Sequence, residues 1–118
     1  MDELLYDTAL LDEIGSKKST IKVLQFYLVD SPQYLQDIET LISQKDLTGI
    51  IKKSHKLKGS LGMLKADLLV SLLNQMEAAA SSTLDFEKLE ELLVILKGKM
   101  KILDSQLLQE IQNIKDSL

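Results

Sequence analysis

His55 is the one histidine of the chain, and the residues around it have types and spacings that could do chemistry. If this segment is helical, two lysines flank the imidazole: Lys52, three residues before it, and Lys58, three residues after it. Gly59 at i+4 and Gly62 at i+7 fall on the same side of the helix. A neutral imidazole is a competent nitrogen nucleophile near pH 7, and a lysine can neutralise charge on phosphoryl oxygens. The pattern suits phosphoryl transfer.

The two glycines on this face need an explanation, because a glycine inside a helix costs about 1 kcal/mol relative to alanine. On a helical wheel of about 100° per residue, His55 falls roughly 130° from the centre of the apolar stripe and should face water. Gly59 and Gly62 would then clear side chains from around the ring, so that a bulky partner can reach it. Close packing of another helix against Gly62 is the alternative.

Composition excludes several other kinds of site. The chain has no cysteine and a single histidine, which leaves no thiolate or histidine-pair metal site. Its net charge of -4 argues against nucleic-acid binding. Gly-rich nucleotide loops and a clear acidic cluster for Mg²⁺ are missing from the sequence. We therefore expect no cofactor, and any partner in phosphoryl transfer must bring the rest of the machinery.

The elements that position His55 are predicted to be helices, since helix formers dominate and strand-like alternation is missing. We predict long amphipathic helices at about 17–44, 46–62, 67–80 and 85–115, and a short extra helix from Asp7 to Ile14. Short connections between them predict an all-α, antiparallel up-down-up-down four-helix bundle, with residues 1–118 as a single domain. A monomer is expected because the bundle uses every apolar stripe. No membrane span or secretory signal is recognised, so the cytoplasm is the expected location.

Pro32 is the one ambiguous point in the first long helix. Apolar residues continue at three-four spacing on both sides of it, which favours one helix kinked at Pro32. The alternative is a break, with Ser31 capping a new helix that starts at the proline.

The segment Ser54-His55-Lys56-Leu57-Lys58-Gly59-Ser60 resembles the histidine-containing phosphotransfer (HPt) family. The resemblance extends over about residues 6–112 and includes six further features: Phe26-Tyr27-Leu28, Ser31-Pro32, Leu64, Ala66, Leu72 and Met76-Glu77. Two residues depart from the family pattern. Lys65 stands where a glycine is usual, and Leu61 stands where a small or polar residue is common.

The resemblance implies a role for each residue of the motif. His55 matches the phosphorylated histidine, Lys58 the basic residue beside it, and Gly59 and Gly62 the small residues that leave it room. The implied partners are receiver domains of response regulators or hybrid kinases, which would supply the only Mg²⁺. We expect a phosphocarrier in a multistep phosphorelay, without nucleotide binding or independent enzymatic turnover.

Three residues are candidates for access and docking around His55. Lys52 would add to the positive field, while Ile51 and Met63 could form an apolar docking patch. Two other functions are open. A non-catalytic helical adaptor could bind a receiver or another signalling partner through the same face, and a small enzyme could use His55 as a general base. The enzyme is disfavoured because the sequence shows no carboxylate arranged to orient the ring.

Overall fold

The computed structural model describes residues 3–118, and all the regular structure in that range is helical. The helices are α1 (Ala9–Ile14), α2 (Lys17–Ser43), α3 (Leu47–Met63), α4 (Asp67–Ala78) and α5 (Phe86–Asp116), with a π-helical segment η1 (Ala79–Thr83) between the last two. The predicted all-α class is confirmed, and the predicted bounds of the long helices agree to within two residues at every end.

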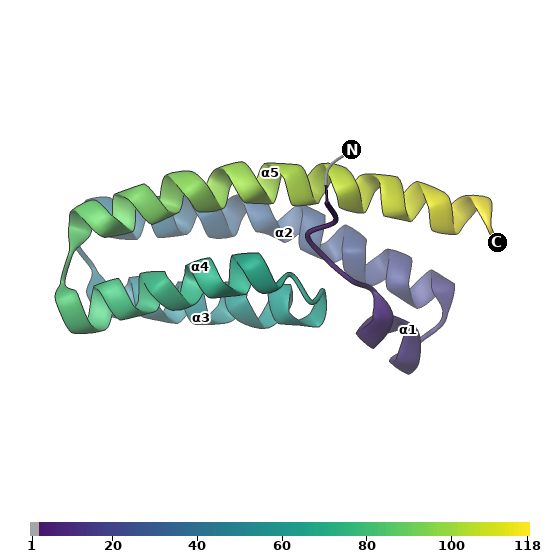
Figure 1. The fold of residues 1–118 in the computed structure, drawn as a ribbon, viewed down its shortest axis with the longest axis horizontal. Helices are drawn as coiled ribbons and strands as arrows, with labels where there is room; N and C mark the ends of the chain where they lie inside the picture. The colour runs from purple at the N-terminus through teal and green to yellow at the C-terminus, as the bar shows by residue number, and fades with distance from the viewer. Residues whose placement is uncertain (1–2) are drawn as a thin grey trace.

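The four long helices form a bundle in which each runs opposite to the one before it, as the colour order in Figure 1 shows. α2 and α5 lie side by side as one pair, and α3 and α4 form the second pair beneath them. α2 and α5 are also longer than α3 and α4, so they extend beyond them, and the short α1 lies at that extension. The bundle therefore presents α3, which carries His55, on one side of the molecule.

The core consists of the apolar stripes that the helical spacing predicts. α3 and the residue that caps its end contribute four of the buried side chains, and α5 contributes side chains along most of its length. They are Ile50, Leu57, Leu61, Leu64, Leu89, Leu92, Leu96, Met100, Leu103 and Leu107. Leu61, which departs from the family pattern, is completely buried. The apolar spacing of residues 67–80 also predicts Leu68 in the core, but Leu68 is 45% exposed, because it lies beside the stripe formed by Leu69, Leu72 and Leu73.

α2 continues through Pro32 without interruption, so the alternative of a break is wrong. The physical reason is packing. Leu24 on one side of the proline and Ile38 on the other are both fully buried, so both halves of the helix pack against the same core. This burial offsets the loss of one backbone hydrogen bond at the proline.

Side-chain caps fix where several helices begin. Asp46 accepts a hydrogen bond from Gly49 N at 2.9 Å and starts α3, as predicted. Ser16 and Asp85 cap α2 and α5 in the same way. The residue types Ser81-Ser82-Thr83 predict a loop, but residues 81–83 continue α4 as the π-helical segment. The chain then reverses at Leu84, whose φ of 52° ends the helix.

Lys65 ends α3 in a backbone conformation that favours glycine. Its φ is 49°, and the turn closes with Lys65 N donating to Gly62 O and Ala66 N donating to Leu61 O, both at 3.0 Å. This is the Schellman arrangement, in which the left-handed position is usually glycine. Lysine in place of the usual glycine at position 65 therefore leaves the turn intact, although the lysine has a left-handed backbone conformation.

Replacing Lys65 with Gly is expected to stabilise the protein by about 0.5–1 kcal/mol, because it removes the clash of Cβ with the backbone. Urea unfolding followed by circular dichroism measures the change. Lys101→Gly, in the middle of α5, is the contrasting variant and should destabilise by about 1 kcal/mol. Equal losses for the two substitutions would show that the conformation at Lys65 is not strained.

Candidate functional site

His55 lies in the middle of α3 with its side chain 76% exposed, as the wheel predicts. Ser54, one residue before His55, and Leu57, two residues after it, are completely buried. Their burial fixes which side of α3 faces the core. The imidazole therefore projects outward from a rigid element, where a large partner can reach it.

Glu77 on α4 is the acidic residue nearest to the imidazole. Its Oε1 lies 3.8 Å from His55 Nδ1, which is too long for a hydrogen bond but close enough for electrostatic attraction to a positively charged ring. Oε1 is buried and has no hydrogen-bond partner within residues 3–118. The expectation that no carboxylate is arranged beside the ring is therefore wrong. Nδ1 faces Glu77, which leaves Nε2 as the nitrogen available to a partner.

Lys58 contacts Glu77 rather than standing free beside the imidazole. Its Nζ donates hydrogen bonds of 2.9 Å to Glu77 Oε2 and of 2.9 Å to Asn74 Oδ1. The side chains of Lys58 and Glu77 are only 22% and 21% exposed, so the pair is held between α3 and α4. Lys58 thus fixes the carboxylate beside His55 and keeps its own charge one helical turn from the ring.

Gly59 and Gly62 face open space. A Cβ placed on either glycine would meet no atom of the described residues within 4 Å. Close packing of a neighbouring helix, the alternative reading of Gly62, is therefore wrong. Since nothing in the fold itself requires glycine at these positions, the space beside His55 is free for a partner.

The remaining predicted residues separate into two places. Ile51, Lys52, Lys53 and Lys56 line a shallow apolar-floored depression together with His55. Met63 lies elsewhere, in a groove between α2 and α3. The structure therefore does not bring Ile51 and Met63 into one docking patch.

The residues that sequence reasoning missed are Glu77 and Asn74. Both belong to α4, and one turn of helix separates them. The available signal was the resemblance itself, in which Met76-Glu77 forms part of the matching pattern. Its role next to the imidazole becomes visible only when α3 and α4 are packed together.

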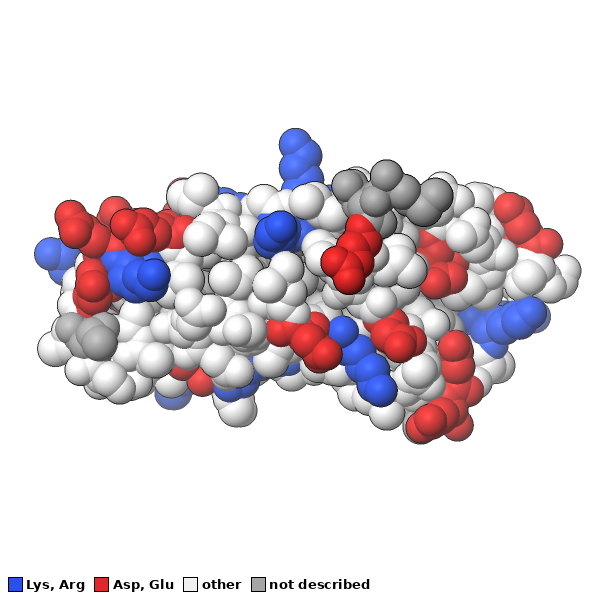
Figure 2. Space-filling view, viewed as in Figure 1, with Lys and Arg blue, Asp and Glu red and all other residues white. Residues whose placement is uncertain are grey.

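Charge is distributed unevenly over the molecule. Acidic side chains gather at the end where α5 begins, as Figure 2 shows, and this part of the sequence contains Asp85, Glu87, Glu90 and Glu91. The segment of α3 around His55 carries lysines instead, at 52, 53, 56 and 58. The side chain at 55 therefore lies in a locally basic part of an acidic protein.

Within residues 3–118, no set of three or more His, Cys, Asp or Glu side chains is placed so that it could ligate a metal ion. None of the helices described combines the length and apolarity that a membrane span requires.

Comparison with known families gives one match. The family model of the Hpt domain matches residues 22–117, which includes α3 with its histidine and the whole of α4 and α5. Hpt domains carry phosphoryl groups in two-component phosphorelays and interact with receiver domains. No curated protein and no solved structure matches the chain. Because the match covers most of the sequence and the helical bundle agrees with it, the chain belongs to the Hpt domain family.

Proposed function

We propose that this protein is the phosphocarrier of a multistep phosphorelay, which takes a phosphoryl group from a receiver aspartate onto His55 and passes it to a second receiver. The observation that carries the proposal is the exposed imidazole with Glu77 on its Nδ1 side. Lys58 holds that carboxylate in place, and Gly59 and Gly62 leave the approach open. The family match supports the phosphotransfer role at a coarser level.

The transfer step follows from this geometry. The lone pair of His55 Nε2 attacks the phosphorus of the aspartyl phosphate, and a nitrogen–phosphorus bond forms. The bond from phosphorus to the aspartate oxygen breaks, and the carboxylate leaves with the electron pair. The ring keeps its proton on Nδ1 and becomes positively charged, next to the Glu77 carboxylate. The reverse sequence delivers the phosphoryl group to the second receiver.

The protein contributes only part of the catalytic environment. Lys52, which forms no ion pair within residues 3–118, supplies positive charge for the phosphoryl oxygens, and Lys58, although paired with Glu77, keeps a second cation one turn from the ring. We propose that the Mg²⁺ required is the one bound by the receiver. His55 is then a carrier without turnover of its own. A cytoplasmic location and a monomeric state stay predictions of this proposal.

An adaptor that binds a receiver without being phosphorylated is the second candidate. It would need the same exposed face but not a reactive nitrogen. The Glu77 carboxylate beside Nδ1 favours the carrier, because mere binding gives no reason to place a half-buried acid against the ring.

The proposal is tested by mixing the purified protein with a radiolabelled phospho-receiver and Mg²⁺. Label is expected on the protein, and it should be labile in acid and stable in base, as a phosphoramidate is. Acid-stable label would indicate a serine or threonine instead. Failure of every receiver domain encoded in the same genome to transfer label would favour the adaptor.

Glu77→Gln is expected to slow transfer about tenfold, because the amide cannot stabilise positive charge on the ring. The same variant keeps the size of the side chain, so the helical circular dichroism should not change. Stopped transfer reactions give the rate, and NMR of the phosphorylated wild type should place phosphorus on Nε2. The exposed Glu91→Gln on α5 is the matched control. Equal rates for the two variants, or phosphorus on Nδ1, would remove Glu77 from the mechanism.

A further inference from the structure

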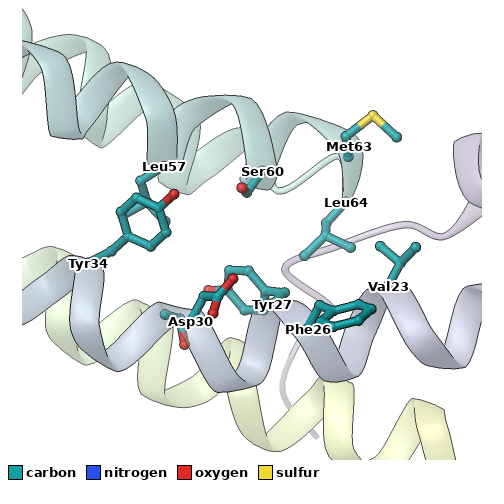
Figure 3. A pocket seen from close by; sticks show the side chains of 10 residues that line it. Val23, Phe26, Tyr27, Asp30, Tyr34, Leu57, Ser60, Met63 and Leu64 are labelled. Carbon is teal, nitrogen blue, oxygen red and sulfur yellow. The ribbon is translucent and has the colours of Figure 1, made fainter.

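A groove between α2 and α3 lies further along the histidine-bearing helix. It has a volume of about 230 Å³ and is lined on its rim by Val23, Phe26, Asp30, Tyr34, Ser60 and Met63. Figure 3 shows the α2 residues on one side, with Ser60 and Met63 opposite them on α3. The completely buried Leu57 and nearly buried Leu64 close it from below.

The two ends of the groove differ in chemistry. One end is apolar, with Phe26 69% exposed and Met63 39% exposed on opposite walls. Toward the other end, between Phe26 and Tyr34, lies Asp30, which is exposed and forms no ion pair with any of residues 3–118. An exposed aromatic and a methionine are typical of interface anchors, and a free carboxylate beside them attracts a cation.

This chemistry fits one kind of side chain. Arginine and lysine combine an apolar stem with a cationic tip, so the stem can pack between Phe26 and Met63 while the tip reaches Asp30. Lys53 lies near the same end, but its charge is offset by Asp37, whose carboxylate is 3.1 Å from its Nζ.

The groove is continuous with the phosphoacceptor site. Lys53 lines the depression that holds His55 and also the hollow that holds Asp30 and Tyr34, two residues of the groove. Ser60 and Met63 follow His55 by five and eight residues, roughly 8–12 Å along the axis of α3 and turned toward α2. A standard interface buries about 800 Å² on each partner and easily spans this distance. The groove is therefore within reach of a receiver seated on His55.

We infer that the groove binds an arginine or lysine of the receiver and so selects which receiver His55 serves. This inference rests on the proposed phosphocarrier function and adds a contact point to it. Two sites of opposite charge then orient the receiver. The lysines around His55 face the acidic phosphorylation site of the receiver, and Asp30 faces a basic residue of the same receiver.

The test measures transfer from whichever phospho-receiver labels the wild type, over a range of receiver concentrations. Phe26→Ser and Asp30→Lys are expected to raise the half-saturating receiver concentration at least fivefold, with the rate at saturation within a factor of two. Phosphoramidate donates to histidine without a receiver, so it reports the reactivity of His55 alone. The ratio of receiver-dependent to phosphoramidate-dependent labelling should fall by the same factor.

Val29→Ser is the matched control, because Val29 is on the same helix and is 75% exposed but lines a different groove, between α2 and α5. It should leave both reactions unchanged. Wild-type behaviour of Phe26→Ser and Asp30→Lys would overturn this inference while leaving the phosphocarrier proposal in place. The inference would also be overturned if these two variants lowered the rate at saturation and left the half-saturating receiver concentration unchanged. Labelling of the wild type by phosphoramidate but by no receiver would overturn the phosphocarrier proposal and this inference together.

Discussion

His55→Gln is expected to abolish acceptance of a phosphoryl group, with a fall of at least about a thousandfold in the rate of labelling. The amide nitrogen of glutamine has no available lone pair, so it cannot form the bond to phosphorus. The side chain at 55 is 76% exposed, and a polar residue of similar size should leave the bundle undisturbed. The measurement is radiolabel transfer from the phospho-receiver, followed by gel separation.

The control for this variant is Lys101→Gln, an exposed position on α5 that should keep the full rate of labelling. Circular dichroism should show the same helix content for both variants. Label that persists on His55→Gln would place the acceptor elsewhere, and its stability in acid would distinguish a hydroxyl from a lysine. A binding assay with the receiver is the further measurement. If His55→Gln binds the receiver as the wild type does, the substitution has removed phosphoryl transfer without removing docking.

The fold could be predicted from the sequence because each helix has a single apolar stripe. The three-four spacing of Leu57, Leu61 and Leu64 fixes which side of α3 is buried, and therefore that His55 is exposed. Local spacing also brings Lys58 near the histidine. These features depend only on the geometry of one helix, so no knowledge of the neighbouring helices was needed.

Features that depend on two helices could not be predicted in the same way. Glu77 reaches His55 only because α4 packs against α3, and the wheel of either helix alone does not give their relative rotation and height. The same holds for the groove, which combines Phe26 of α2 with Met63 of α3. The sequence placed Met63 on the exposed side of α3 but paired it with Ile51, since both were considered on one helix only.

Asp104 on α5 is a further residue whose environment depends on how two helices pack. It comes four residues after Met100 and three before Leu107, both in the core, so its position borders the apolar stripe. Its Oδ1 is buried and has no hydrogen-bond partner within residues 3–118. Burial raises the pKa of Asp104 to about 6. Burial, with the nearby charge of Asp104 as a second cause, also raises the pKa of Tyr27 on α2.

The raised pKa predicts that stability falls as the pH rises. In the unfolded chain an aspartate has its ordinary pKa of about 4, so the folded protein binds a proton that the unfolded chain releases between about pH 4 and 6. The stabilisation from the protonated form is complete below about pH 4 and is lost as the pH passes 6. The full shift corresponds to about 3 kcal/mol, and partial exposure of Asp104 reduces this to about 1–2 kcal/mol.

Asp104→Asn is therefore expected to raise the free energy of unfolding at pH 7.5 by about 1–2 kcal/mol and to leave it nearly unchanged at pH 4. Urea unfolding at the two pH values gives the difference directly. Asp116→Asn, at the exposed end of α5, should have little effect at either pH. An equal gain at both pH values would mean that the carboxylate carries no buried charge. Because the charge of Asp104 acts on Tyr27 of α2, the substitution should leave the rate of transfer at His55 on α3 unchanged.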